Sequence, residues 1–182
     1  MQQEVIIAGF GGQGVLFAGQ LISYAAMDEG KEVTWIPSYG PEMRGGTANC
    51  TVVVSDEEIG SPFVKNPTAV MAMNLPSLEK FEPLVEPGGV LVVNSSMVNR
   101  QVQREDITVV SLPANDIAEA LGSKRSVNMV MLGALLVNMD LLSLEAAEKA
   151  LDAHLPERHK KFLGANKEAL RKGAEFKVRV QA

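Results

Sequence analysis

The sequence of 182 residues lacks most of the groups that would give it redox chemistry or a membrane anchor of its own. Its single cysteine, Cys50, excludes a disulfide within the chain, an all-cysteine zinc site and an iron–sulfur cluster held by this chain alone. The longest apolar run, residues 129–137, is far shorter than the ~20 residues that span a bilayer. No basic stretch precedes an apolar one near Met1, so we expect no signal peptide, a cytoplasmic location and no membrane contact.

Positive charge is also scarce. Lys and Arg total 17 against 22 Asp and Glu, which gives a net charge of −5 at pH 7. Nucleic-acid-binding domains are usually basic, so we expect no nucleic acid as a partner. The positive charge that is present gathers near the C-terminus, where residues 158–182 hold 8 basic and 2 acidic side chains. This basic segment either docks on an acidic partner or forms a solvated helix face.

The apolar pattern predicts strands that alternate with helices over residues 1–121. The predicted strands are residues 5–8, 33–36, 47–55, 69–73, 90–93 and 107–112, and the helices among them are 13–29, 76–84 and 113–121. Helices at 127–142, from Ser143 and at 158–172 follow, and alternation in 176–180 favours an edge strand. This order predicts one α/β domain, residues 1–182, with a Rossmann-like open, mostly parallel sheet, helices on both faces and a helical C-terminal end.

A glycine-rich segment follows the first predicted strand and opens the first helix, with the sequence Gly9-Phe10-Gly11-Gly12-Gln13-Gly14. It fits G-x-G-x-x-G, in which glycines permit a tight turn and the helix N-terminus presents amides to an anion. Val15 and Leu16 stand where a P-loop needs Lys and Ser or Thr, so the segment is no nucleoside-triphosphatase motif. It predicts an anion or cofactor site at Gly9, Gly11, Gly12, Gln13 and Gly14, or else glycines that only let the helix pack on the sheet.

A second loop follows the second predicted strand and contains Tyr39, Glu42, Arg44, Gly45 and Gly46. In an open α/β sheet, such a loop lies at the carboxyl edge beside the glycine segment. A guanidinium there is suited to bidentate binding of a carboxylate or phosphate. Alternatively, the glutamate and the arginine pair with each other or with a neighbouring chain. The strand before this loop ends without the acidic residue that holds the ribose of NAD, which weighs against a nicotinamide site.

The remaining reactive or polar side chains have plainer interpretations. Cys50 lies in a β-rich run and is interpreted as a core residue. His154 and His159 are five positions apart, which is not the spacing of a helical zinc site, so both are expected at the surface. Asn128 is a polar residue inside the most apolar helix, and it either caps that helix or reaches the glycine segment; we favour the cap. Residues 127–142 are apolar on nearly every side, so we expect part of this surface to be an interface.

Three segments together resemble the gamma subunit of 2-oxoacid:ferredoxin oxidoreductases: the glycine segment, the loop Tyr-Gly-Pro-Glu-Met-Arg-Gly-Gly at 39–46, and Asn-Met-Val-Met-Leu-Gly at 128–133. The likeness extends over nearly the whole chain and is greatest to the 2-oxoglutarate and branched-chain (ketoisovalerate) versions of a family that also uses pyruvate. The resemblance implies that a 2-oxoacid, coenzyme A and oxidised ferredoxin give an acyl-CoA, carbon dioxide and reduced ferredoxin.

The resemblance also implies which chain holds which cofactor. Thiamine diphosphate with Mg²⁺ and the iron–sulfur clusters are expected on alpha, beta and ferredoxin-like delta subunits, because this sequence has one cysteine and no Gly-Asp-Gly segment followed by paired asparagines. This chain is expected to have no catalytic residue and no metal, and to shape the coenzyme A or substrate side of the assembly. We expect the isolated chain to be inactive and to form a homodimer. The alternatives are a free-standing NAD- or FAD-binding Rossmann-type oxidoreductase and a purely structural subunit.

Overall fold

The computed structural model describes residues 1–40, 45–139 and 141–178. Its strands are β1 (Gln2–Phe10), β2 (Glu32–Tyr39), β3 (Thr47–Ser55), β4 (Ala69–Ala72), β5 (Val90–Asn94) and β6 (Thr108–Leu112). Its α-helices are α1 (Val15–Asp28), α2 (Leu75–Phe81), α3 (Ala114–Ala120), α4 (Val127–Asn138), α5 (Leu144–His154) and α6 (Leu163–Ala174). Short 3₁₀ turns η1 (Glu82–Leu84), η2 (Lys124–Ser126) and η3 (Glu157–Phe162) join some of them. Within these residues, no helix has the length and apolar character to cross a membrane.

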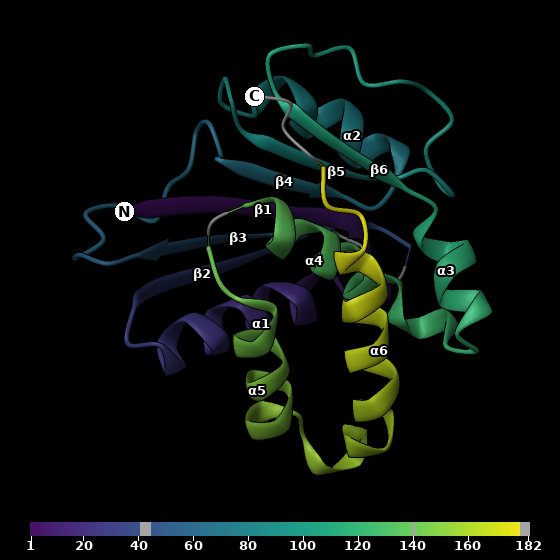
Figure 1. The fold of residues 1–182 in the computed structure, drawn as a ribbon. Helices are drawn as coiled ribbons and strands as arrows, with labels where there is room; N and C mark the ends of the chain where they lie inside the picture. Colours follow the sequence, from purple (N-terminus) through teal and green to yellow (C-terminus); the bar gives the residue numbers. More distant parts are fainter. Residues whose placement is uncertain (41–44, 140, 179–182) are drawn as a thin grey trace.

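The six strands form one sheet in the order β2-β3-β1-β4-β5-β6 (Figure 1). Strands β1, β4, β5 and β6 pair in parallel, whereas β3 is antiparallel to both β1 and β2, so that β2 runs in the same direction as β1. The prediction of an open, mostly parallel α/β sheet is therefore confirmed. The exception arises because β2 and β3 form a hairpin, in which Gly40 N donates to Thr47 O at 2.8 Å. The returning strand inserts between β1 and β2.

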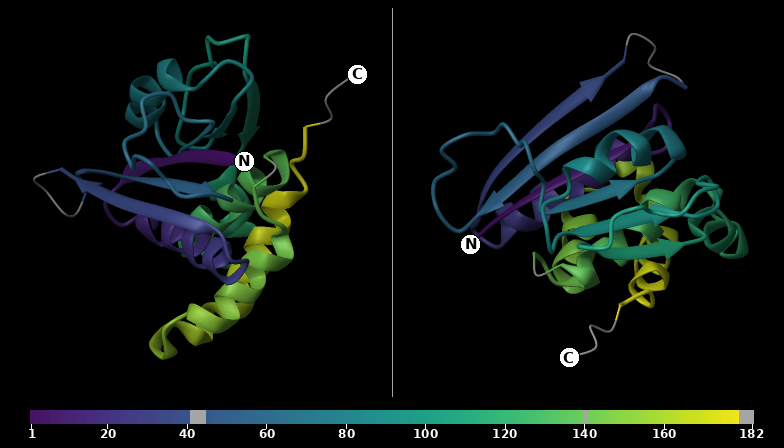
Figure 2. Two further views of the ribbon diagram at one scale, coloured as in Figure 1. Left: turned by 90° about the vertical axis from the view of Figure 1, so that its left-hand side faces the viewer. Right: turned by 90° about the horizontal axis from the view of Figure 1, so that it is seen from above.

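Helices cover both faces of the sheet, as predicted (Figure 2). Alternate residues of β1 enter different cores: Val5 and Ile7 face the large one with α1 and α4, whereas Ile6 and Ala8 face a smaller one with α2. The two cores differ in size because α3, α4, α5 and α6, which all follow β6, join α1 on one face of the sheet. On the other face, α2 and η1 supply the helical cover.

Helix α4 is enclosed by the chain itself. Every residue from 128 to 136 is buried, between the sheet on one side and α6 on another. The helices touch backbone to backbone at Gly133 and Gly173: a Cβ on Gly133 would lie 2.0 Å from Leu170 O, and one on Gly173 would lie 1.8 Å from Val130 O. The expectation that this apolar surface is partly an interface is therefore wrong, because α6 supplies the cover that we assigned to a second chain.

The end of the described chain forms no sixth pairing at the sheet. Residues 176–178 have no regular structure, and residues 179 and 180 of the predicted edge strand lie outside the described part. The side chain of Asn138 holds this segment, since its Nδ2 donates to Phe176 O at 2.9 Å and its Oδ1 accepts from Val178 N at 2.8 Å. The segment therefore lies against the C-terminal end of α4, where the Asn138 amide makes the hydrogen bonds that a neighbouring strand would otherwise make.

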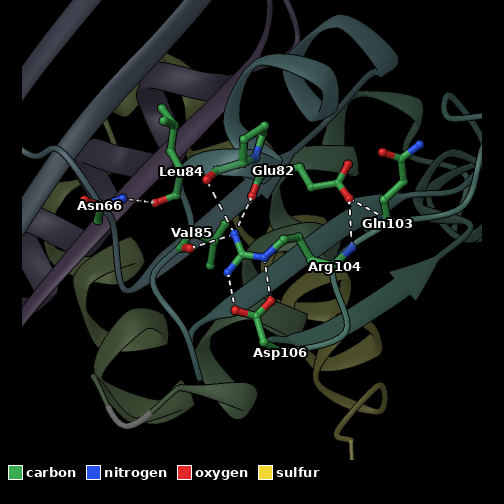
Figure 3. Close-up of polar contacts among 8 residues, drawn as sticks. Asn66, Glu82, Leu84, Val85, Gln103, Arg104 and Asp106 are labelled. Carbon is green, nitrogen blue, oxygen red and sulfur yellow. Dashed lines mark hydrogen bonds and ion pairs between the residues drawn. The ribbon is translucent and has the colours of Figure 1, made fainter.

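A buried carboxylate fixes the amino edge of β5 and β6 (Figure 3). Parallel strands usually need a helical crossover, but residues 95–107 connect these two without one. Glu82, 4% exposed, accepts from Arg100 at 2.7 Å and from the amides of Gln103 and Arg104 at 2.5 and 3.3 Å. Arg104 in turn donates to both carboxylate oxygens of Asp106 and to the carbonyl of Val85. We call these residues, Glu82, Arg100, Arg104 and Asp106, the amino-edge clamp.

The hydrogen bonds of the amino-edge clamp also set the protonation of its central carboxyl group. Burial raises the pKa of Glu82, but the Gln103 amide and the Arg100 guanidinium stabilise the charged form more strongly in sum. The pKa of Glu82 therefore lies below its ordinary value near 4.5. The carboxylate is ionised at neutral pH, and its charge is compensated within the chain.

Candidate ligand site at the carboxyl edge of the sheet

The glycine segment forms the turn between β1 and α1, as the sequence predicts. Gly14 has φ 76° and precedes α1, which has no side-chain cap at its N-terminus. The first amides of α1 therefore lack a capping acceptor, the arrangement that binds anions at helix N-termini. Gly12 has φ 97°, and a Cβ added there would meet no atom within 4 Å. Its backbone is thus open to a ligand approaching the start of the helix.

Gln13 folds back and holds the glycine turn in shape. Its Oε1 accepts from Phe10 N at 2.6 Å and from Asn74 Nδ2 at 3.2 Å. Asn74 also caps α2, because its Oδ1 accepts from Ser77 N at 3.0 Å. The helices α1 and α2 follow the neighbouring strands β1 and β4 on opposite faces of the sheet. This pair of strands is a topological switch point, where open α/β sheets bind their ligands.

The sequence argument overlooked Asn74, although a signal was present. An asparagine directly after a buried strand and before Leu75-Pro76 is typical of a helix N-cap. The sequence position of Asn74 is therefore sufficient to predict its role as a helix cap. The contact with Gln13 depends on two strands 61 residues apart in sequence becoming neighbours, which local pattern does not encode.

Asn128 holds the glycine turn from the other side. Its Nδ2 donates to Gly14 O at 3.1 Å, and its Oδ1 accepts from Met129 N at 3.0 Å. We favoured a helix cap for this residue, but Ser126 occupies the N-cap position, and the asparagine reaches the glycine turn. A Cβ on Gly14 would lie 2.4 Å from Asn128 Nδ2, and one on Gly9 would lie 2.6 Å from Gln13 Oε1. Packing thus requires glycine at positions 9 and 14, and a positive φ requires it at positions 12 and 14.

The second predicted loop lies directly against the glycine turn. Gly11 N donates to Gly46 O at 2.8 Å, and Gly45 N donates to Gly11 O at 3.4 Å. Tyr39, at the end of β2, is 54% exposed. Glu42 and Arg44 lie outside the described residues, and a role for them remains a prediction. The turn and the described ends of the loop form one backbone-bonded unit at the carboxyl edge.

The other candidates from the sequence lie outside this unit, although Cys50 Sγ contacts Val15 O, directly after the glycine turn, at 3.7 Å. Cys50 is fully buried on β3, and burial raises the pKa of its thiol to about 12, so it remains protonated. His154 contacts both carboxylate oxygens of Asp28 at 2.9–3.0 Å and stacks on Tyr24. His159 lies exposed in η3. In the part of the chain that the structure describes, no three His, Cys, Asp or Glu residues are grouped to hold a metal ion.

A mostly parallel, open sheet with an uncapped glycine turn at its switch point defines a Rossmann-like α/β domain. Residues 4–176 match the model of the family described as pyruvate ferredoxin/flavodoxin oxidoreductase, and the chain belongs to this family. The sequence-based resemblance to its gamma subunits is thereby confirmed.

Individual relatives agree with this assignment. The chain is 39% identical over 163 residues to the 2-oxoglutarate synthase subunit KorC of Methanothermobacter marburgensis, which covers 86% of this chain and 88% of the relative. It is 38% identical over 174 residues to the ketoisovalerate oxidoreductase subunit VorA of Methanothermobacter thermautotrophicus. That match covers 95% of this chain but 36% of VorA, so the chain spans about a third of this longer relative.

Two solved structures share the fold over nearly the whole chain. The gamma subunit of a keto/oxoacid ferredoxin oxidoreductase from Geobacter sulfurreducens is 30% identical with a TM-score of 0.81, and the match covers 95% of this chain and 96% of that one. A chain of the 2-oxoglutarate:ferredoxin oxidoreductase of Magnetococcus marinus, solved with 2-oxoglutarate, coenzyme A and succinyl-CoA bound, is 25% identical with a TM-score of 0.85. That match covers 96% of this chain and 31% of the other.

Proposed function

We propose that the chain is the gamma subunit of a multi-subunit enzyme that converts a 2-oxoacid, coenzyme A and oxidised ferredoxin to an acyl-CoA, carbon dioxide and reduced ferredoxin. The observation that carries this proposal is the uncapped start of α1 beside an open Gly12, held at the switch point by two asparagines. The Magnetococcus marinus enzyme, which contains a domain of this fold, was solved with coenzyme A bound. KorC and VorA support 2-oxoglutarate or a branched-chain oxoacid as the substrate.

Coenzyme A fits the residues of the carboxyl edge. Its phosphates are anions, and the first amides of α1 are donors without a side-chain acceptor. Gly11, Gly12 and Gly14 allow the backbone to approach such a group, and Gln13 holds the turn. The loop with Tyr39, Glu42, Arg44, Gly45 and Gly46 adds a guanidinium for a phosphate or carboxylate. In this proposal the chain binds and orients coenzyme A, and none of its residues is catalytic.

The other cofactors of the reaction do not fit this chain. An iron–sulfur cluster needs several thiolates, and the single cysteine is buried with a pKa of about 12. We therefore assign the clusters, thiamine diphosphate and Mg²⁺ to alpha, beta and ferredoxin-like delta subunits, and the reduction of ferredoxin to the complete cytoplasmic complex. The basis for a homodimer of the isolated chain is gone, because α6 covers α4; contacts with the other subunits replace it in the proposal.

The geometry also weighs against the NAD- or FAD-binding alternative. In a dinucleotide-binding Rossmann domain, the strand that carries the ribose-binding acid lies next to the strand of the glycine turn. Here β3 lies between β1 and β2, and β2 ends in Ser38 and Tyr39 without an acid. A purely structural subunit makes a different prediction, because substitution of Gly12 would then leave the KM of the complex for coenzyme A unchanged.

The test is co-expression of this chain with candidate alpha, beta and delta chains from the same genome, followed by omission of one chain at a time. We expect 2-oxoacid- and coenzyme-A-dependent reduction of ferredoxin by the complete set. The purified single chain is expected to show no activity and to contain neither iron nor thiamine diphosphate by elemental and cofactor analysis. Activity of the single chain overturns the proposal. Full activity of the set without this chain overturns it equally.

A further inference from the structure

A pocket of about 790 Å³ lies beside the glycine turn, on the same face of the sheet as α1. Its walls come from three separate segments: Phe17 and Gln20 of α1, the turn η2 with Arg125, and η3 with Arg158 and Phe162. Figure 1 shows the α5–α6 hairpin that carries η3 beside α1 and α4. Nothing proposed above uses this pocket, and it is large enough for a nucleotide-sized ligand.

Three cationic side chains line the pocket, and two of them have no carboxylate partner among the described residues; the third, Lys124, pairs with Glu119 at 2.6 Å. No Asp or Glu is among the described residues that line it. Arg125 has no ion pair within the described chain, and Arg158 donates to the ring of His159 rather than to a carboxylate. The basic side chains of α6 behave differently: Lys167 pairs with Asp152, and Arg171 makes two bonds to Glu148. Two guanidinium groups without a carboxylate partner favour an anionic ligand, above all a phosphate.

Neutral polar groups and the start of α4 complete the anion-binding side. The hydroxyls of Ser123 and Ser126 are 2.7 Å apart, and Ser126 donates to Asn166 Oδ1 at 3.2 Å. The Asn166 amide nitrogen has no hydrogen bond within the described residues. Ser126 occupies the N-cap position of α4, whose positive dipole end therefore lies at the pocket. These groups supply further hydrogen-bond donors for an anion that the two arginines bind.

The opposite side of the pocket is apolar. Phe17 and Phe162 are half-buried and line the pocket together with the buried Leu155. Aromatic faces beside guanidinium groups suit a ligand with a flat ring at one end and a phosphate at the other. Inorganic phosphate alone would leave these apolar side chains without a contact.

We propose that this pocket binds a phosphorylated nucleoside, with its phosphate at Arg125 and Arg158 and its base against Phe17 and Phe162. Asn128 lines the pocket and also donates to Gly14 O, so the pocket begins beside the glycine turn. The nucleoside is either the adenosine end of coenzyme A, which rests on the proposed function, or a free nucleotide that acts as a regulator. Both have the same chemistry at the pocket.

The test is calorimetric titration of the full chain with ADP, coenzyme A and inorganic phosphate. The double variant Arg125→Ala/Arg158→Ala is compared with Lys65→Ala/Lys177→Ala, which removes the same charge at exposed positions outside the pocket. We expect ADP and coenzyme A to bind, and the arginine variant to weaken both by at least about 10-fold, as loss of a bond to a charged group does. The lysine control retains wild-type affinity. Phe162→Leu, which keeps an apolar side chain, weakens ADP binding as well.

The glycine turn separates the two sources. If Gly12→Val weakens the binding of coenzyme A but not of ADP, the pocket holds the adenosine end of coenzyme A. If coenzyme A and ADP bind equally and Gly12→Val affects neither, the ligand is a free nucleotide. Binding of coenzyme A that depends on Gly12 but not on the arginines overturns the pocket and leaves the proposed function intact. Failure of ADP and coenzyme A to bind, or phosphate binding as tight as ADP binding, also overturns it.

Discussion

The two edges of the sheet are held by different chemistry. At the amino edge, the amino-edge clamp joins η1 to residues 95–107 through ionised groups that compensate one another. At the carboxyl edge, neutral amides hold the glycine turn instead. Asn74 donates to Gln13, and Asn128 donates to the carbonyl of Gly14. A neutral amide satisfies a backbone group without placing a competing charge beside a ligand. We therefore expect substitutions at the amino edge to change stability, and we propose the carboxyl edge as the ligand-binding side.

The largest expected effect is on stability and comes from the amino edge. Glu82→Ala removes a buried carboxylate and leaves Arg100 without its ion pair, so we expect a loss of about 3 kcal/mol in the free energy of unfolding. Glu105→Ala removes an exposed carboxylate from the same segment and is expected to stay within about 0.5 kcal/mol of wild type. Urea unfolding measures both. Equal stability of the two variants would remove the contrast between the edges.

The next effect is on function and concerns Arg44. Arg44→Lys keeps the charge but loses the bidentate geometry. If the guanidinium holds a phosphate or carboxylate of coenzyme A or substrate, kcat/KM of the assembled enzyme falls about 10- to 150-fold. A variant that no longer co-purifies with the other subunits, while the remaining complex has normal kinetics, makes Arg44 an interface residue. Unchanged assembly and kinetics remove the loop from the site.

Asn74→Ala tests whether the asparagine acts on the glycine turn or only on α2. It removes a helix cap and the bond to Gln13. Ser143→Ala removes the cap of α5, where Ser143 Oγ accepts from Ala146 N, and touches no part of the site. Both are expected to cost about 1 kcal/mol of stability. Only Asn74→Ala is expected to raise the KM for coenzyme A, and an equal KM in both variants would reduce Asn74 to a cap.

The smallest effect is a pH dependence at the amino edge. Because the folded pKa of Glu82 lies below its ordinary value near 4.5, its contribution is complete above that pH and disappears as the pH falls through the folded pKa. The stability difference between wild type and Glu82→Gln is therefore expected to be constant between pH 5 and 7 and to narrow below about pH 4.5. Unfolding curves at several pH values measure it. A difference that grows in acid would contradict the assignment.

The sequence predicts the strands and the glycine turn well because both depend on local pattern. The six strands predicted before residue 113 all exist, whereas residues 176–178 of the predicted tail strand have no regular structure. The two glycine-containing loops meet as the carboxyl-edge rule requires. The antiparallel direction of β3 is missed because it depends on β3 pairing back along β2, which the apolar pattern does not distinguish from a crossover. The cover of α4 is missed for a similar reason: Gly133 and Gly173 are 40 residues apart, and only their meeting permits the close helix contact.

The site is predicted less completely than the fold. Each of the two loops is a short stretch rich in glycine, so the glycine turn and the loop beside it can both be recognised in the sequence. Asn74 and Asn128 act through tertiary contacts, and the pocket combines Phe17, Arg125 and Arg158 from three distant segments. No spacing rule connects such residues before the chain folds.

The most direct test of the contrast between the edges is the KM for coenzyme A in the complex assembled with Gly12→Val. Gly88→Val is the matched control, because Gly88 also has a positive φ, 81°, and no atom within 4 Å of an added Cβ, but lies at the amino edge. Both substitutions carry backbone strain of about 1–3 kcal/mol. We predict that Gly12→Val raises the KM for coenzyme A at least about 10-fold without changing the KM for the 2-oxoacid, and that Gly88→Val changes neither. An unchanged KM for coenzyme A in the Gly12→Val complex would contradict the account.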